Sequence, residues 1–405
     1  MTSTIDLDHL LASCSDAGTE AAIRIQTELE PIGGPGASVK PAVYEGGRYQ
    51  QDHRWETVEA DEAAPVIVID NVPSQANRLE AALRAISGEV GLPEIVLDLS
   101  GVADLPAHLP RTLSSWQFPH RNADAYLRDA QLDGVDFTKT DLGKAIFAAT
   151  PWAAGPLMSW FPQAMLYGFW QSHLGKKRAN TKHARAWVSE IIGWRPAATD
   201  TRTLGVKGDP LNLSGDDQVT SDENDRETWS TGKVKIEGAK THKLSKIGHG
   251  QVPFMREDDP DAEKRPAAAG VSFARVSQLA TVSFAQLRRV SVGEGAPPEA
   301  DTAARALLAA LGLLGHASAF GRGFALRSGA DLVPNHATAQ WVGASRDSVE
   351  LPTISEATAL LSDARNHAES AGVPLDGWGR EPIALTAKDN LADAIRATWP
   401  LDGIA

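Results

Sequence analysis

The chain has 405 residues, 42% of them hydrophobic, so it can bury a sizeable core in two or three domains or in one elaborated domain. A single cysteine, Cys14, excludes an internal disulfide framework, and the N-terminal residues lack the basic and apolar regions of a secretion signal. We therefore expect a soluble, cytoplasmic protein without a membrane partner. The net charge of -13 argues against nucleic-acid binding as a first interpretation, because such proteins usually carry a basic surface.

Residues 21–29 alternate between apolar and polar side chains, which is typical of a strand with one buried and one open face. Ile23 and Ile25 lie on the apolar side, whereas Arg24 and Gln26 lie on the other. We expect Arg24 to be available to a ligand on the open face.

A second strand followed by a helix is predicted between residues 65 and 87. Residues 66–69 are a β-branched run, and Ser74 is expected to cap an amphipathic helix over 74–87. The start of this helix carries a hydroxyl, two amides and a cation, the groups that a phosphate or a base edge needs, from Ser74, Gln75, Asn77 and Arg78. An ordinary capped surface helix is the alternative.

Residues 92–99 are predicted to form a further strand, and a long insertion over 101–265 follows. The insertion contains an aromatic-rich helical segment, and we expect most of its large aromatic residues in the core: Trp152, Trp160, Phe161, Tyr167, Phe169 and Trp170. Basic residues then gather between 175 and 208, among them Lys176, Lys177, Arg178, Lys182, Arg185 and Arg202. An acidic and a second basic run follow, so residues 205–250 are predicted to protrude with basic edges. The alternative for each run is an ordinary solvated surface.

Regular structure is expected to resume at residue 266. The patterns indicate a strand within 270–284, a buried helix over 301–315, and a last strand over 324–333 that follows Arg322 and its flanking glycines. Residues 336–405 are expected to form a helical extension. The predicted divisions are 1–100, 101–265, 266–335 and 336–405.

These elements give the order βαββαβ, which predicts an α+β, ferredoxin-like core with a large insertion and a protruding thumb. Such a sheet buries one face under two helices, and RNA-recognition modules bind single strands on the other face. A doubly wound dinucleotide fold is disfavoured, because no G-x-G-x-x-G follows a predicted strand.

The sequence offers no recognisable catalytic set, metal site or cofactor motif. It lacks the phosphate-binding G-x-x-x-x-G-K-[ST], the zinc motif H-E-x-x-H and the nucleophile motif G-x-S-x-G. His120, His183 and His249 lie near basic or polar residues, and a histidine beside a cation could act as a general base in RNA cleavage. Each is more often a structural hydrogen-bonding residue.

Six sequence blocks, in order, carry a resemblance to a known family. They include A-A-I-R-I-Q-T-E-L-E-P-I-G-G-P-G (21–36), V-I-D-N-V-P-S-Q-A-N-R-L-E-A-A-L (68–83), P-H-R-N-A-D-A-Y-L-R-D (119–129), R-A-W-V-S-E-I-I-G-W (185–194), K-L-S-K-I-G-H-G-Q-V-P (243–253) and G-F-A-L-R-S-G-A-D-L-V-P (323–334). The chain resembles the CRISPR-associated RAMP family called Csb-one, the Cas-seven-type backbone subunit of the type I-U (I-G) Cascade complex.

The resemblance implies a modified RNA-recognition fold, many copies of which stack along one CRISPR RNA and present its spacer to a target DNA strand. The implied partners are CRISPR RNA, target DNA, further copies of the chain and other Cascade subunits, and no catalytic role is implied. We expect RNA contacts from Arg24, Ser74, Gln75, Asn77, Arg78, Lys176, Lys177, Arg178, Lys182, Arg185, Arg202 and Arg322. Two alternatives stay open, a RAMP endoribonuclease that processes CRISPR RNA and a metabolic enzyme.

Overall fold

The computed structural model describes most of the chain. The residues outside its description are 1–2, 45–47, 58, 104, 106–108, 173–180, 198–210, 212, 214–216, 222–228, 232–239, 245–248, 250–269 and 399–405. The chain divides into two compact units, one of residues 1–42, 50–196 and 270–405 and another of residues 43–49 and 197–269. Each unit is described by itself.

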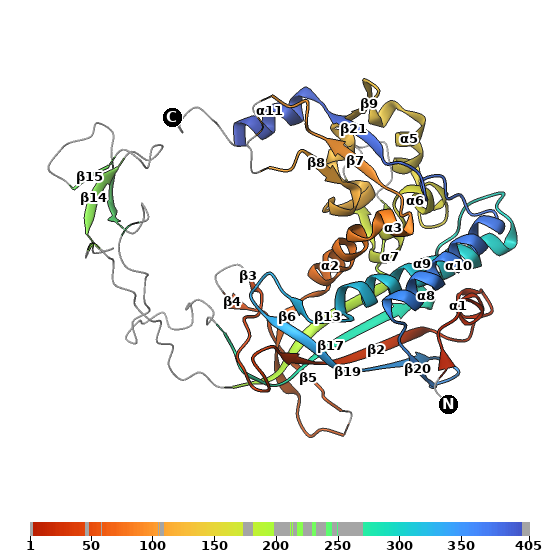
Figure 1. Cartoon of the computed structure of the whole chain (residues 1–405), viewed down its shortest axis with the longest axis horizontal. Helices are drawn as coiled ribbons and strands as arrows, with labels where there is room; N and C mark the ends of the chain where they lie inside the picture. The colour runs from red at the N-terminus through yellow and green to blue at the C-terminus, as the bar shows by residue number, and fades with distance from the viewer. Residues whose placement is uncertain are drawn as a thin grey trace. The chain divides into compact units, whose positions relative to one another are not determined.

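The first unit is built on a nine-stranded sheet (Figure 1). Its order is β1 (Ser3–Thr4), β20 (Ser348–Glu350), β19 (Asp331–Val342), β2 (Ala22–Pro31), β17 (Phe273–Ser283), β13 (Trp187–Pro196), β6 (Ala64–Asp70) and β5 (Gln51–Arg54), with β18 (Phe324–Ala325) paired to β19. All neighbours are antiparallel except β1 and β20. The alternation predicted for residues 21–29 is confirmed, because Ile23 and Ile25 are buried and Arg24 and Gln26 are exposed.

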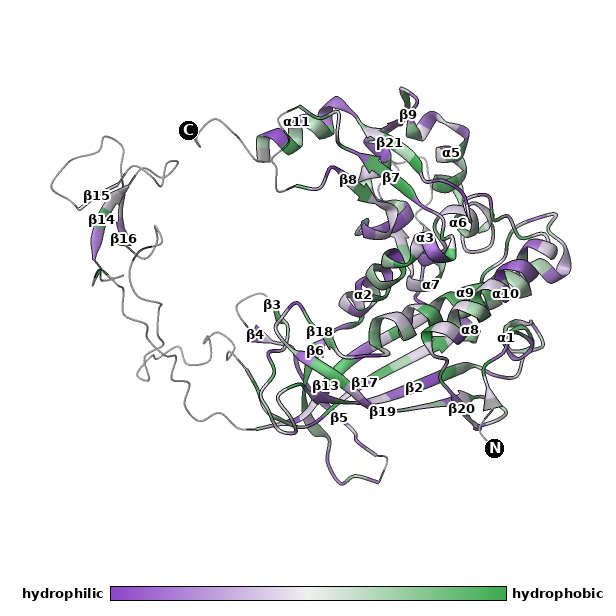
Figure 2. Ribbon diagram, in the orientation of Figure 1, coloured by the Kyte–Doolittle hydropathy of each residue, from purple (hydrophilic) through white to green (hydrophobic). Residues whose placement is uncertain are grey.

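Helices cover one face of this sheet, and the longest is buried nearly all round. They are α2 (Val72–Ala85), α9 (Pro298–Phe320) and, packed on α9, α10 (Ile354–Ser370) (Figure 1). α9 carries hydrophobic residues along most of its length (Figure 2). It is long and apolar enough to cross a membrane, but 89% of its apolar window is buried inside the protein, as in the core helix of a globular domain.

A second sheet of five strands lies in the same unit. Its order is β10 (Val135–Asp136), β9 (Ala130–Leu132), β21 (Ile383–Ala387), β7 (Ile95–Asp98) and β8 (Thr112–Ser114). The strand predicted over 92–99 is therefore real, but its placement in the main sheet is wrong, because it pairs with β8 and with β21 near the end of the chain. The strand beside β17 is instead β13, which lies within the predicted insertion, residues 101–265.

The remaining helices of the first unit are short and fill the space around the two sheets. They are α1 (Leu7–Cys14), α3 (Ser87–Val90), α4 (Ala125–Arg128), α5 (Asp141–Ala148), α6 (Gly155–Trp160), α7 (Pro162–Tyr167), α8 (Phe284–Leu287) and α11 (Asp389–Thr398), with 3-10 turns at Ser115–Gln117, Arg121–Ala123 and Phe137–Lys139. The prediction that residues 336–405 are helical is correct for α10 and α11 but wrong for β19, β20 and β21.

The aromatic-rich segment divides between core and surface. Phe161, Tyr167 and Phe169 are buried as predicted, whereas Trp152 and Trp170 are exposed. Trp170 lies on β11 (Phe169–Gln171), which pairs with β12 (Thr181–His183). The alternation of this strand explains why Phe169 is buried and Trp170 exposed, because neighbouring residues on a strand point to opposite sides.

The second unit contains two small antiparallel sheets among its described residues. One joins β3 (Val43–Tyr44) to β4 (Arg48–Tyr49), and the other places β14 (Gln218–Ser221) between β15 (Trp229–Ser230) and β16 (Lys240–Lys243). The Trp229 ring lies 5.5 Å from the His249 ring. Most of the predicted thumb, residues 205–250, lies outside the described residues.

Candidate nucleic-acid interface

The start of α2 is capped one turn earlier than the sequence predicts. The capping residue is Asn71, whose side chain accepts a hydrogen bond from the Ser74 amide at 3.1 Å. Pro73 has no N–H to offer, and the Gln75 amide donates to the Asn71 carbonyl at 2.9 Å. The prediction that Ser74 caps the helix and leaves free amides for a phosphate is therefore wrong, because the polar residues of the first turn bond to one another.

Gln75 also departs from its predicted role, since its side chain is 0% exposed. Its amide nitrogen donates to Asp70, and its amide oxygen accepts from Gln278 at 2.8 Å and from Ser189 at 3.2 Å. These bonds tie α2 to three strands of the main sheet. We correct the expectation that Gln75 contacts RNA, because a buried amide held by three hydrogen bonds inside the protein is not available to a ligand.

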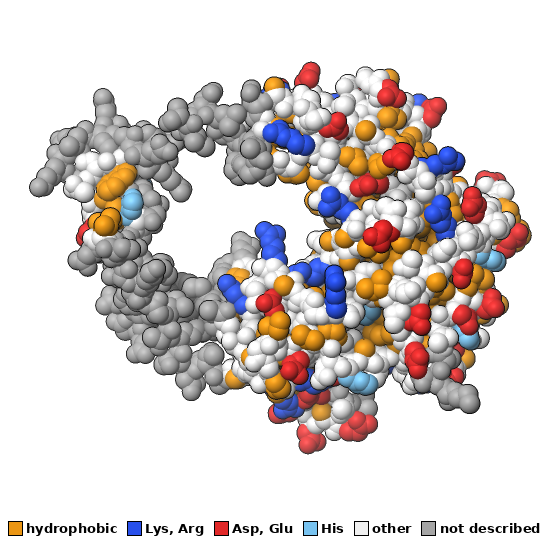
Figure 3. Space-filling model, in the orientation of Figure 1, with side chains coloured by type: hydrophobic (Ala, Val, Ile, Leu, Met, Phe, Trp, Pro, Cys, Tyr) orange, Lys and Arg blue, Asp and Glu red, His pale blue; other side chains and the backbone are white. Residues whose placement is uncertain are grey.

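Two of the predicted cations, Arg78 and Arg322, line one cavity of about 470 Å³, which we call the α2–α9 cavity. Its walls come from α2, the end of α9, β18 and the start of α10. Arg78 donates through Nε to the nearly buried Asp70 at 2.7 Å. Arg322 is exposed and has no ion-pair partner among the described residues, and Asn77 is exposed on α2. Figure 3 shows Lys and Arg side chains gathered over α2 and β18, whereas Asp and Glu predominate over α10.

Two more of the predicted cations, Lys182 and Arg185, line a second cavity of about 760 Å³, which we call the β11–β12 cavity. Its other lining residues include His120, Arg121, Tyr167 and Trp170. Trp170 and Lys182 are direct cross-strand neighbours, and the Lys182 Nζ lies 6.0 Å from the centre of the Trp170 indole. An exposed aromatic ring beside a cation is a surface on which a nucleic-acid base can stack.

Arg121, which lines the β11–β12 cavity, belongs to a buried ion pair. Arg121 donates through Nε and Nη2 to both carboxylate oxygens of Glu80, at 2.7 and 2.8 Å, and through Nη1 to the Gly168 carbonyl at 2.9 Å. Burial raises the pKa of Glu80, and the charge of Arg121 opposes that rise. Gly168 has φ of +81°, and a Cβ there would lie 2.8 Å from the His183 carbonyl oxygen, so only glycine fits this approach.

Like Lys182, Arg185 lines this cavity and forms no ion pair among the described residues. Its Nε is buried and makes no hydrogen bond among the described residues. Desolvation lowers the pKa of Arg185 and the neighbouring charge of Arg121 lowers it further, whereas the charge of Glu80 opposes the shift. An anion at this position would relieve both effects, because it would supply a hydrogen-bond acceptor and a compensating charge.

The open face of the main sheet is less basic than an RNA-binding surface requires. Arg24 is exposed there, but the neighbouring cations are paired with carboxylates: Arg275 with Glu28 at 3.1 Å and Glu56 at 3.4 Å, Arg195 with Glu56 at 2.6 Å, and Arg54 with Glu190. Residues from β6, β13 and β17 also form a small apolar cluster on this face, comprising Ala64, Val66, Ile192, Trp194 and Leu279. The unpaired predicted cations therefore lie mainly beside α2.

His183 and His120, which both line the β11–β12 cavity, differ in exposure. The ring of His183 is buried with Nε2 2.9 Å from the Met165 carbonyl oxygen, and desolvation lowers its pKa. His120 is exposed at the rim of the same cavity. Among the described residues, no group of three or more His, Cys, Asp or Glu side chains could hold a metal ion.

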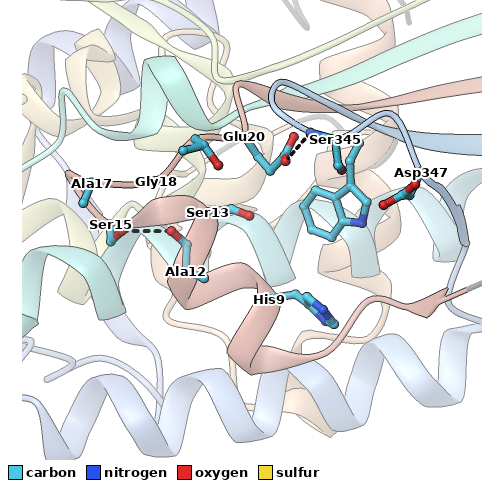
Figure 4. A pocket seen from close by; sticks show the side chains of 11 residues that line it. His9, Ala12, Ser13, Ser15, Ala17, Gly18, Glu20, Ser345 and Asp347 are labelled. Atoms are coloured by element: carbon cyan, nitrogen blue, oxygen red, sulfur yellow. Dashed lines mark hydrogen bonds between the residues drawn. The ribbon is translucent and has the colours of Figure 1, made fainter.

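A third cavity, of about 570 Å³, differs in charge from the other two. It lies between α1 and the connection from β19 to β20, with His9, Trp341 and Asp347 on its walls (Figure 4). Glu20 accepts a hydrogen bond from the Ser345 amide at 3.0 Å, and its second carboxylate oxygen is buried without a partner. Two carboxylates at one site disfavour a phosphate, so this cavity does not belong to the candidate interface.

Two residues of the β11–β12 cavity, Trp170 and Arg121, were not among the predicted RNA contacts. Trp170 was assigned to the core with its neighbours, and only its place on a short strand, opposite a lysine, indicates exposure. Arg121 was passed over because it lies far along the chain from its partner Glu80. The predicted contacts Lys176, Lys177, Arg178 and Arg202 lie outside the described residues.

Comparison with known families gives one match. Residues 23–196 match the protein-family model described as CRISPR-associated protein GSU0053, a span that runs from β2 to the end of β13 and covers less than half of the chain. The match includes α2 and the β11–β12 cavity, whereas Arg322 lies beyond it. No curated protein matches the chain. The family match supports a CRISPR-associated protein with a role in CRISPR defence.

Proposed function

We propose that the chain is a non-catalytic backbone subunit of a type I-U (I-G) Cascade complex, which binds CRISPR RNA in the cytoplasm. The observation that carries the proposal is the placement of cations. Arg322, Lys182 and Arg185 have no carboxylate partner among the described residues, and all three line cavities that adjoin α2. Phosphates of a single strand are the ligands that such cations suit.

The order of the central strands supports a ferredoxin-like core. From β2 the chain passes through α2 to β13, then β17, α9 and β19, and these strands lie in the order β19, β2, β17, β13. A βαββαβ unit with antiparallel neighbours has this arrangement. In this proposal β5 and β6 extend one edge of the core, and β20 and β1 extend the other.

The proposed partners are further copies of the chain, a target DNA strand paired to the guide, and other Cascade subunits. A backbone subunit needs a continuous basic path for one strand, and its outer surface can be acidic. The net charge of -13 is therefore compatible with RNA binding, because neither cavity beside α2 has an Asp or Glu among its lining residues.

An endoribonuclease is the second candidate, because His120 and His183 line the same cavity as Lys182. A general base for cleavage must reach the attacking 2′-hydroxyl with a free ring nitrogen. One nitrogen of His183 is engaged by the Met165 carbonyl, and its lowered pKa disfavours the cationic form that a general acid needs. Efficient cleavage uses both a general acid and a general base, and the exposed His120 alone can provide only one of the two.

Co-expression with a CRISPR array tests the proposal. The full chain should co-purify as a large particle with RNA of defined length, visible by absorbance at 260 nm and by gel. His120→Ala should leave the length of that RNA unchanged, because the residue is exposed and outside the core. Purification of an RNA-free monomer would refute the binding role, and accumulation of unprocessed RNA with His120→Ala would favour the nuclease.

A further inference from the structure

The β11–β12 cavity is lined by an exposed tryptophan, Trp170, whose side chain is not packed in the core. Trp170 is 64% exposed, whereas its strand neighbours Phe169 and Gln171 are buried. The register pairs Trp170 with Lys182, so both side chains leave the same face of the two-stranded sheet. A tryptophan this exposed gives up most of its burial energy, and a stacking ligand would recover it.

The same cavity has unbalanced positive charge in a partly desolvated place. Glu80 neutralises Arg121 through two hydrogen bonds, which leaves Lys182 and Arg185 without a carboxylate among the described residues. The buried Nε of Arg185 needs an acceptor. A flat apolar surface and an anion-binding guanidinium are thus combined within about 760 Å³, a volume in the range that holds small organic ligands.

We propose that the β11–β12 cavity is a subsite for one unpaired nucleotide of a single-stranded RNA, with the base stacked on Trp170 and a phosphate held by Lys182 and Arg185. The subsite rests on the proposed RNA-binding function and adds to it a contact with the base face. Because every base has such a face, the subsite is tolerant of sequence. An acidic peptide would use the cations but would gain little from the indole.

Binding of a fluorescent oligouridylate to the purified full chain, measured by anisotropy, tests this subsite. Trp170→Ala should weaken binding at least about fivefold, the lower end of the effect of removing one base–aromatic stack, and Trp170→Phe should restore most of it. Trp152→Ala is the matched control, because Trp152 is 67% exposed elsewhere on the same unit and should change nothing. Both residues are exposed, so circular dichroism should show a retained fold.

A ribose-phosphate oligomer without bases separates stacking from charge. It should bind the wild-type chain and Trp170→Ala equally, whereas Arg185→Gln should weaken its binding. If the wild type binds oligouridylate and Trp170→Ala binds it with the same affinity, the subsite is overturned and the proposed function still stands. If the wild-type chain binds no RNA, both the subsite and the proposed function are overturned. If Trp170→Ala weakens the binding of a polyglutamate peptide as much as that of oligouridylate, the ligand is a protein and the nucleotide subsite is overturned.

Discussion

Removal of one exposed cation from each cavity beside α2 should flatten the salt dependence of RNA binding. The change is Lys182→Gln with Arg322→Gln, one residue from each cavity beside α2. Each cation that contacts a phosphate of a single strand contributes about 0.7 to the slope of log affinity against log salt, so the double variant should lose about 1.4. Between 50 and 200 mM salt, the fold-loss of affinity should then be about seven times smaller for the double variant than for the wild type.

The choice of residues matters, because Arg78 would confound the test. Its Nε bonds to the nearly buried Asp70, so neutralising Arg78 would leave a carboxylate with one partner fewer and would destabilise the fold. Lys182 and Arg322 have no carboxylate partner among the described residues, so their loss should spare stability.

The assay is oligouridylate binding at five or more salt concentrations, with Arg346→Gln/Arg380→Gln as the control. Both control residues are exposed and have no ion-pair partner in the described part of the chain, so the control removes equal charge away from the two cavities. Equal slopes for the two double variants would refute the reasoning, since the effect would then come from net charge alone.

Three further predictions concern stability. Arg121→Met should cost about 3–5 kcal/mol in urea unfolding, because Glu80 would be left buried and uncompensated, and adding Glu80→Gln should recover part of the loss. Burial lowers the pKa of His316 from its ordinary 6.5 to about 4, so as the pH falls the unfolded chain takes up a proton at this residue before the folded chain does. The free energy of unfolding should therefore fall by about 3 kcal/mol as the pH drops from about 6.5 to 4. His316→Gln should lack this part of the pH dependence. Gly312→Ala should lower the melting temperature, despite its gain in helix propensity, because its Cβ would lie 2.6 Å from the buried Trp187 ring; overpacking of this kind costs about 1–3 kcal/mol. An unchanged or raised melting temperature would contradict the last.

The sequence predicts the elements with a clear burial pattern well. The alternation around Ile25 reflects a strand with one buried face, and the apolar run of α9 reflects a helix that is buried nearly all round; both elements appear where expected. Sheet membership is different, because an apolar run such as Ile95–Asp98 pairs equally well with any strand that reaches it. The partners of β7 and β13 depend on contacts between distant parts of the chain, which no local pattern encodes.

The sequence predicted which residue types lie in the candidate interface, but not which of their side chains are accessible to a ligand. Arg78 and Arg322 were selected separately and lie in one cavity. The amide of Gln75 is a group that could contact RNA, yet it makes three buried hydrogen bonds with residues of the sheet. Whether a polar side chain faces solvent or the core follows from the angle at which the helix meets the sheet, and composition does not reveal that angle.

The pairing of β21 with β7 has a consequence for folding during translation. Ile383 lies opposite Ile95, so the middle strand of the five-stranded sheet leaves the ribosome only after most of the chain has been made. Until then, one edge of β7 has no strand beside it and exposes hydrogen-bonding groups along an apolar segment. At ordinary elongation rates, the pairing of β7 with β21 can therefore form only many seconds after β7 itself has been made.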